Sequence, residues 1–181
     1  MALARTETCN SLRSISSAGL VQRCRKDFRL QFDEKGRFIL SVVNVLIVDP
    51  FEPWRHFLVL FLTENPSLQV IGVASDGLEA VQKAAGLQPD LIVMEISLPN
   101  LNGIDAVRQV RSVAPQCKIL FLSREPDPEM AGTAFREGAR GYVLKEHLVR
   151  DLAAAVATVI QGKKFVSHEL ASYDFSDNTE C

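Results

Sequence analysis

The sequence predicts a doubly wound α/β domain, and three observations carry this prediction. From residue 44 onward, short apolar runs alternate with stretches whose apolar residues recur at helical spacing. The apolar runs are continuous, as expected for strands that are buried on both faces of a parallel sheet. The segments between them are short, as βαβ units require. Five strands alternating with five helices therefore predict one parallel sheet with helices on both faces.

The first four elements have clear limits. Residues 45–48 are a compact run of Val, Leu and Ile that ends at Asp49 and predicts a strand. Residues 53–62 carry aromatic and apolar side chains at helical spacing, and an Asn-Pro pair follows them. Residues 68–74 predict the second strand, and an Asp-Gly pair then leads into a helix at 78–87.

The same alternation continues to the end of the domain. Residues 91–96 are apolar except for Glu95 and predict the third strand, which a Pro- and Gly-containing loop follows. A helix at 104–113 and a fourth strand at 118–122 come next. The last predicted elements are a helix at 129–137, a strand at 141–144 and a helix at 149–161. For this count of strands, the most economical arrangement is a five-stranded parallel sheet with the flavodoxin-like order 2-1-3-4-5.

Composition divides the 181 residues into three parts. Residues 1–41 form a basic N-terminal extension, since the first 40 residues carry a net charge of +4 and the remainder a net charge of −6. We expect this extension to be poorly ordered, apart from a short strand or hairpin within residues 28–40. The folded domain is predicted at 42–167, and an acidic polar tail at 168–181. No apolar run approaches the roughly 20 residues that a membrane span needs.

Cysteines and histidines show no metal-binding pattern. The four cysteines are scattered, with no C-x-x-C pair and no histidine at ligand spacing. This argues against a zinc site or a disulfide framework and predicts reduced thiols in a cytoplasmic protein. His56, His147 and His168 are isolated in the sequence and are expected at surface or helix-cap positions.

Polar side chains gather at the predicted carboxyl ends of the strands, where doubly wound sheets bind their ligands. Asp49 follows the first strand, Glu95 lies near the end of the third, Ser123 follows the fourth and Lys145 follows the fifth. Each residue alone says little, because an acid at a strand end often only caps a helix. Two carboxylates, a hydroxyl and an ammonium at strand ends together predict one shared site.

Six sequence runs resemble the receiver domain of response regulators, in particular the receivers of the LuxR/NarL class. They occur in the family's order and span roughly two thirds of the chain. The runs are VLIVD at 45–49, ASDGLEA at 74–80, QPDLIVMEI at 88–96, LPNLNGI at 98–104, KILFLS at 118–123 and GARGYVLK at 138–145. The resemblance implies membership of a two-component phosphorelay.

The resemblance also assigns roles to the strand-end residues. In the family, a histidine kinase passes a phosphoryl group to an aspartate at the position of Glu95. Asp49, Glu95 and the backbone carbonyl of Ser97 would hold the Mg²⁺ that neutralises the transferred group. The positions implied for the conformational switch are Ser123, Tyr142 and Lys145.

This sequence departs from the family at two of those positions. Glu95 replaces the phosphoacceptor aspartate, and its extra methylene displaces the carboxylate by ~1.5 Å in a reaction that depends on positioning. Pro50 replaces the second acid after the first strand, which removes a hard oxygen ligand for Mg²⁺. We therefore expect a pseudo-receiver with weak or absent phosphoryl transfer and weakened Mg²⁺ binding.

Two interpretations of Glu95 remain open at this point. Its longer carboxylate could reach toward Ser123 and Lys145 and imitate the phosphorylated state permanently. Alternatively, Glu95 could form an ion pair with Lys145 in a domain that serves as an inert binding module.

The expected output is contact with another signalling protein, either a histidine kinase or a downstream effector. Only a short tail follows residue 167, so we expect a stand-alone receiver with no nucleic-acid or membrane partner. The family's contact face would include residues around Met130, Phe135, Tyr142 and Val156, of which Phe135 and Val156 are expected in the core.

Two alternative interpretations remain open, and two are disfavoured by the sequence. A homodimerising scaffold on the same fold and a weakly phosphorylated receiver both remain compatible with the sequence. A small hydrolase built on Asp49, Ser123 and His147 is disfavoured, because no G-x-S-x-G elbow surrounds Ser123. No Walker A or G-x-G-x-x-G motif predicts nucleotide chemistry, and we do not expect an enzyme.

Overall fold

The computed structural model describes residues 30–32, 38–40 and 42–175, and the chain divides into two units after Ser41. The described part of the first unit is an antiparallel pair of strands, β1 (Leu30–Phe32) and β2 (Phe38–Leu40). This pair confirms the hairpin expected within residues 28–40. The division after Ser41 coincides with the change in composition.

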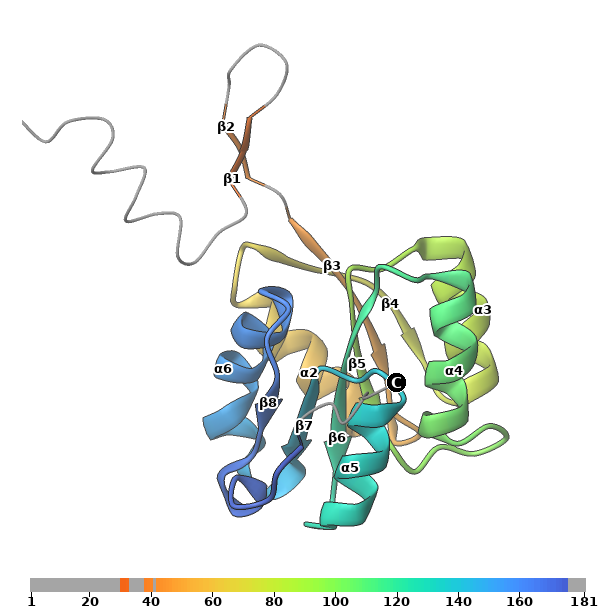
Figure 1. The fold of residues 1–181 in the computed structure, drawn as a ribbon. Coiled ribbons are helices and arrows are strands. Elements are labelled where there is room, and N and C mark those ends of the chain that lie inside the picture. The colour runs from red at the N-terminus through yellow and green to blue at the C-terminus, as the bar shows by residue number, and fades with distance from the viewer. Residues whose placement is uncertain (1–29, 33–37, 41, 176–181) are drawn as a thin grey trace, which may run out of the picture. The chain divides into compact units, whose positions relative to one another are not determined.

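The second unit is an α/β domain built on one parallel sheet (Figure 1). The strands are β3 (Val43–Val48), β4 (Leu68–Ala74), β5 (Leu91–Glu95), β6 (Lys118–Ser123), β7 (Gly141–Leu144) and β8 (Phe165–Val166). Their order in the sheet is β4-β3-β5-β6-β7-β8, and every neighbouring pair is parallel. The first five strands of the domain thus have the predicted order 2-1-3-4-5.

The predicted count of five strands omits β8, the short sixth strand. Phe165 N donates to Arg140 O at 3.0 Å, and Ser167 N donates to Tyr142 O at 3.0 Å. These bonds complete the ladder along the outer side of β7, an edge that would otherwise expose unpaired backbone groups. Two residues are too few to give a strand pattern, which is why the sequence shows only a connecting segment here.

Five α-helices connect the strands. They are α2 (Glu52–Thr63), α3 (Gly77–Leu87), α4 (Gly103–Val113), α5 (Pro128–Arg136) and α6 (Leu148–Ile160), with short 3-10 turns η1 (Lys145–His147) and η2 (His168–Leu170). The observed limits agree with the predicted ones to within one residue at most ends. Asp76, Asn102 and Asp127 cap α3, α4 and α5 by accepting hydrogen bonds from backbone N–H groups of the first turn.

Two apolar cores lie on opposite faces of the sheet. Helices α3, α4 and α5 cover one face, and α2 and α6 cover the other (Figure 1). Phe135 and Val156, expected in the core, are 4% and 3% exposed, which confirms their assignment. Tyr142 is fully buried, whereas Met130 is 39% exposed. Within the described residues, no helix is long and apolar enough to cross a membrane.

The first part of the predicted tail packs against the domain. Leu170, in η2, is only 1% exposed and belongs to the core on the α3–α5 face. The ring of Phe175 lies 5.2 Å from that of Phe135, and Lys164 Nζ donates to Phe175 O at 2.8 Å. Residues 168–175 therefore contribute to the folded unit.

Candidate functional site at the carboxyl edge of the sheet

Three of the four predicted strand-end residues meet at the carboxyl edge. Asp49 follows β3, Glu95 is the last residue of β5, and Lys145 directly follows β7. Lys145 Nζ lies 2.5 Å from Asp49 Oδ2 and 2.6 Å from Glu95 Oε2. The side chain of Lys145 is 4% exposed and each carboxylate is 1% exposed. One ammonium therefore joins two carboxylates away from water, which is how a buried charge is tolerated.

The two oxygens of Glu95 have different surroundings. Oε1 accepts a hydrogen bond from Ser97 N at 3.0 Å. Oε2 is buried and close to Lys145 Nζ, but no group among the described residues donates a hydrogen bond of good geometry to it. The contact with Lys145 is thus mainly electrostatic, and Glu95 Oε2 keeps unused accepting capacity.

Asp49 is held by the backbone at the start of α2. Its Oδ1 accepts from Phe51 N at 2.9 Å, while its Oδ2 faces Lys145. Both of its carboxylate oxygens are therefore engaged by groups of this chain.

Sequence reasoning missed two neighbours of this site, Trp54 and Arg55, both in the first turn of α2. The Trp54 ring lies 5.1 Å from Lys145 Nζ, and Arg55 Nη1 donates to Asp49 O at 2.6 Å. The Trp54 ring thus contacts the Lys145 ammonium through a cation–π interaction. Their position directly after the first strand could have indicated them, because that turn begins at the carboxyl edge.

Ser123, the fourth predicted residue, lies at the end of β6 but makes no hydrogen bond to Glu95. Its Oγ donates to Glu125 O at 3.1 Å and accepts from Glu125 N at 3.2 Å. Tyr142 OH also points toward Glu125 O, at a long 3.5 Å. Burial is the main cause that raises the pKa of Tyr142, so its hydroxyl is neutral at physiological pH.

The residues present do not fit a bound Mg²⁺, the cation implied by the resemblance. Both Asp49 oxygens already accept a hydrogen bond, Pro50 supplies no side-chain ligand, and Glu95 Oε2 lies 2.6 Å from Lys145 Nζ. Within the described residues, no three His, Cys, Asp or Glu side chains cluster as a metal site would require. The ammonium of Lys145 already occupies the space between the two carboxylates.

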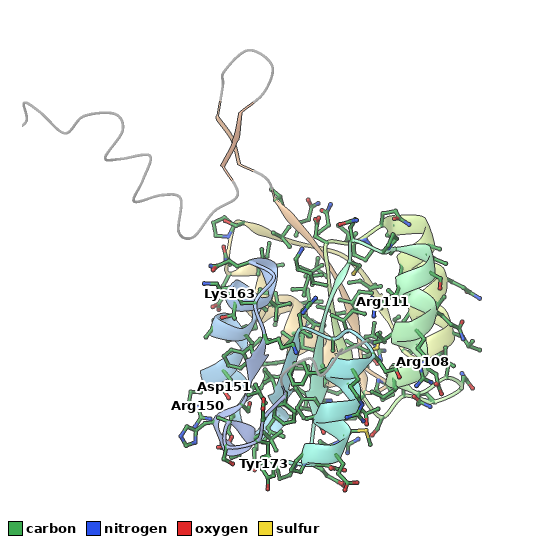
Figure 2. All side chains as sticks on the ribbon, viewed as in Figure 1. Arg108, Arg111, Arg150, Asp151, Lys163 and Tyr173 are labelled. Atoms are coloured by element: carbon green, nitrogen blue, oxygen red, sulfur yellow. The ribbon has the colours of Figure 1, made fainter. Side chains whose placement is uncertain are left out.

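His147, which the sequence leaves isolated, belongs to a second polar cluster on the same side. Its Nε2 lies 2.7 Å from Glu169 Oε1, which connects η1 to η2. Nearby, the Arg150 guanidinium is the largest cause that lowers the pKa of Asp151, and Ser167 Oγ donates to Asp151 Oδ2 at 2.7 Å (Figure 2). The partner of His147 comes from 22 residues later, beyond the reach of any local pattern.

Comparison with known proteins identifies the family of this chain. Residues 45–157 match the response regulator receiver domain family. The transcriptional regulatory protein LnrK of Bacillus subtilis is 33% identical over 131 residues, which are 72% of this chain and 60% of LnrK. The chain thus spans less than two thirds of the length of that relative.

Two solved structures show the same fold. A LuxR-family two-component response regulator from Aurantimonas sp. SI85-9A1 is 28% identical, with a TM-score of 0.70 over 73% of this chain and 94% of that one. The response regulator domain of Thermotoga maritima CheB is 31% identical, with a TM-score of 0.62 over 66% and 97%. Since the family match covers residues 45–157, more than half of the chain, this chain belongs to the response regulator receiver domain family of two-component signalling.

Proposed function

We propose that the chain is a pseudo-receiver, which signals through contact with another protein while its internal Glu95–Lys145 pair takes the place of a transferable phosphoryl group. The observation that carries this proposal is the position of Lys145 Nζ between Asp49 and Glu95. In a phosphorylated receiver this lysine would pair with the phosphoryl group. Here a carboxylate of the chain itself supplies that negative charge.

Access supports the loss of phosphoryl transfer. An acceptor must meet the donor phosphorus in line, and a misplacement of about 1 Å costs roughly 10²-fold in rate. The Glu95 side chain is 1% exposed, and one of its oxygens is held by Ser97 N. Attack on a donor would require Glu95 to leave both Ser97 and Lys145.

The small number of possible metal ligands also supports the loss of phosphoryl transfer. Phosphoryl transfer to a carboxylate needs a divalent cation to neutralise the negative charge that accumulates on the phosphoryl oxygens. The proline at position 50 and the engagement of both Asp49 oxygens leave too few ligands for such an ion.

Intact-mass spectrometry after treatment with a small phosphodonor and Mg²⁺ tests the proposal. We expect no adduct on the wild-type chain and at most a small one on Glu95→Asp. The double variant Pro50→Asp/Glu95→Asp restores both missing acids, so it should gain a phosphoryl group that hydroxylamine removes. Pro50→Asp/Glu95→Gln is the matched control, which has the metal ligand but no acceptor. A stoichiometric, acid-labile adduct on wild-type Glu95 would overturn the proposal.

The output surface proposed for this pseudo-receiver lies at the β8 edge of the sheet and includes the exposed residues of α5 and α6. Of the residues expected there, Phe135, Tyr142 and Val156 are buried, which leaves Met130 as the exposed apolar side chain. Val149, at the start of α6, is 70% exposed and is the second exposed apolar side chain proposed to contact the partner. Substituting Met130 and Val149 by Ser should weaken partner binding without changing the fold.

Glu95→Gln distinguishes permanent imitation of the phosphorylated state from a purely structural pair. The substitution keeps the shape of the side chain and removes the charge that faces Lys145. If Glu95 imitates a phosphoryl group, partner binding should fall in Glu95→Gln. Unchanged binding would leave the ion pair with a structural role only. Light scattering on both proteins shows whether the partner is a second copy of this chain.

A further inference from the structure

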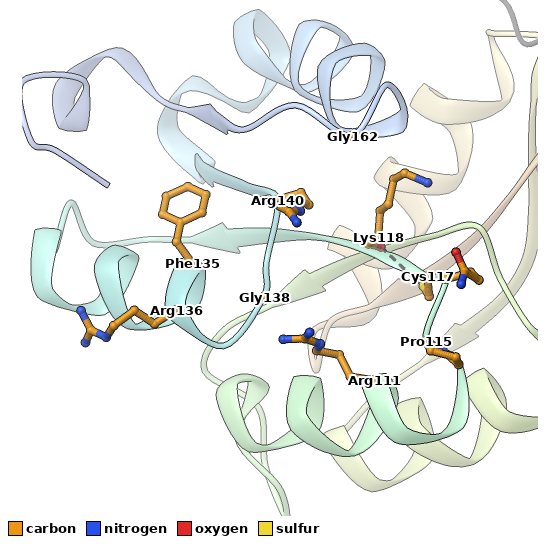
Figure 3. Close-up of a pocket in the computed structure, with 10 residues that line it drawn as sticks. Arg111, Pro115, Cys117, Lys118, Phe135, Arg136, Gly138, Arg140 and Gly162 are labelled. Atoms are coloured by element: carbon orange, nitrogen blue, oxygen red, sulfur yellow. Dashed lines mark hydrogen bonds between the residues drawn. The ribbon is translucent and has the colours of Figure 1, made fainter. Parts of the chain in front are cut away.

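A second concave site lies at the amino edge of the sheet, opposite the carboxylates. It is a pocket of about 410 Å³ between the C-terminal ends of α4 and α5 and the starts of β6 and β7 (Figure 3). A volume of this size falls within the ~300–1,000 Å³ typical of small-molecule sites. Its lining residues are Arg111, Pro115, Gln116, Cys117, Lys118, Phe135, Arg136, Gly138, Arg140 and Gly162.

Four cationic side chains line this pocket, and two of them have roles in the fold. Arg111 lies in the last turn of α4, and its Nη1 donates to Glu137 O at 3.0 Å. Arg136 lies in the last turn of α5, and its Nη2 donates to Thr133 Oγ1 at 2.8 Å. A cation in the last turn of a helix offsets the negative end of the helix dipole, so the stability of the fold accounts for both.

The helix dipole does not explain the other two cations, Lys118 and Arg140. Lys118 is the first residue of β6 and Arg140 directly precedes the neighbouring strand β7, so neither lies on a helix. Their backbone N–H groups are fixed, because Lys118 N donates to Asp90 O and Arg140 N donates to Ile119 O. Neither side chain forms an ion pair or hydrogen bond within residues 42–175. The backbone thus places two unpaired cations side by side at the pocket.

The acidic and thiol groups near the pocket do not cancel this positive charge. Arg108 donates to both carboxylate oxygens of Glu137, at 2.8 and 2.5 Å. Asp90 keeps its negative charge, because Asn44 N, which donates to its Oδ2 at 2.9 Å, is neutral, but one carboxylate does not balance four lining cations. Burial raises the pKa of Cys117 to about 12, so its thiol is neutral. The pocket therefore carries a net positive charge.

Gly138 shapes the wall of the pocket. Its φ of +104° lies in the left-handed region that favours glycine. A Cβ at this position would lie 2.4 Å from Arg111 Nη1. The absence of a side chain lets the Arg111 guanidinium reach across from α4 toward the end of α5 (Figure 3).

We propose that this pocket binds a small phosphorylated ligand of about nucleotide size, with its phosphoryl oxygens at Lys118 and Arg140. A guanidinium presents paired N–H donors that match a phosphoryl group, and an ammonium provides a compact second charge. Pro115 supplies apolar surface for the rest of the ligand. The concave shape and the volume favour a small molecule over an acidic protein segment.

Titration of the ¹⁵N-labelled chain with ADP, with pyrophosphate and with adenosine tests this site by NMR. ADP and pyrophosphate should shift the amide signals of Lys118, Gly138, Arg140 and Gly162, and added salt should weaken both. Adenosine lacks phosphoryl groups and should bind far more weakly. Absence of shifts with both ADP and pyrophosphate, or shifts confined to Asp49 and Lys145 at the other edge, would overturn the proposal.

Paired variants locate the charge that matters. Lys118→Gln/Arg140→Gln should weaken binding of ADP roughly tenfold or more. Arg150→Gln is the matched control, because Arg150 follows β7 at the carboxyl edge and should leave the affinity unchanged. Circular dichroism of each variant establishes that the fold is retained. Equal losses of affinity for ADP in both variants would indicate unspecific electrostatic attraction and contradict the proposal. Binding of a poly-glutamate peptide in preference to ADP and pyrophosphate would also contradict it.

Discussion

The two edges of the same parallel sheet differ in whether their charged side chains are paired. At the carboxyl edge, Lys145 is buried between Asp49 and Glu95, and each charge has an opposite charge within 2.6 Å. At the amino edge, Lys118 and Arg140 face an open pocket without a partner among the described residues. A charge can stay unpaired only where water or a ligand reaches it. The carboxyl edge has thus become part of the core, while the amino edge remains available for binding.

Removing the cation of the buried edge should give the largest effect. Lys145→Met keeps much of the side-chain volume but leaves two buried carboxylates without a counter-charge. We expect the free energy of unfolding to fall by about 3–5 kcal/mol, measured by urea denaturation at neutral pH. Lys163→Met removes an exposed lysine and should change stability by less than about 0.5 kcal/mol. Similar small effects in both variants would mean that water screens the buried pair.

Two glycines of α3 should respond differently to alanine, one at each edge. A Cβ on Gly77 would lie 2.0 Å from the backbone oxygen of Leu101, so Gly77→Ala forces apart two loops at the carboxyl edge. We expect a loss of about 1–3 kcal/mol in the free energy of unfolding. A Cβ on Gly86, at the other end of the helix, meets nothing within 4 Å. Gly86→Ala should therefore stabilise the chain by about 0.5–1 kcal/mol in the same denaturation assay. A stable Gly77→Ala protein would show that these loops adapt.

The smallest expected effect concerns Glu79, in the first turn of α3. Its carboxylate accepts from Ser75 N at 2.7 Å and pairs with Lys83 at 2.7 Å, and Lys83 is the largest cause that lowers the pKa of Glu79 from 4.5 to about 2. A depressed pKa stabilises the fold above pH 4.5, and this contribution is lost as the pH falls toward 2. Because the side chain is 35% exposed, screening limits the contribution to about 1 kcal/mol.

Denaturation of Glu79→Gln as a function of pH measures this contribution. The variant should be less stable than the wild type at neutral pH, and the two should converge as the pH falls through 4.5 toward 2. Glu129→Gln, in the first turn of α5, lacks these contacts and should cost less at neutral pH. A difference that is constant across this range would exclude the charge of Glu79 as its source.

Sequence patterns predicted the elements and the strand order because both depend on local periodicity and on short connections. Continuous apolar runs such as β3 and β5 can only be strands with two covered faces, which fixes the carboxyl edge and brings Asp49, Glu95 and Lys145 together. The two-residue strand β8 was not predicted, because hydrogen bonds to β7 define it and no pattern does.

Within the site, the sequence placed Asp49, Glu95 and Lys145 together and gave the Glu95–Lys145 ion pair as one of two interpretations, but it also expected Ser123 to join them. Both acceptors of Lys145 were named, yet the turn of Ser123 toward Glu125 depends on side-chain geometry that one sequence does not encode locally. The pocket at the amino edge was missed for another reason. Its cations come from four separate elements and connecting segments, with no motif in common, and only the folded chain brings them together.

Ser167 links the segment after β8 to β7 and α6 through buried hydrogen bonds. Its hydroxyl accepts a hydrogen bond from Leu144 N at 3.1 Å and donates one to Asp151, while its own N–H bonds to Tyr142. The residue that follows Leu144 is Lys145. A displacement of the segment after β8 must therefore either break these buried hydrogen bonds or displace β7, which Lys145 directly follows. The C-terminal segment is therefore linked through Ser167 and Leu144 to the buried ammonium at the carboxyl edge of the sheet.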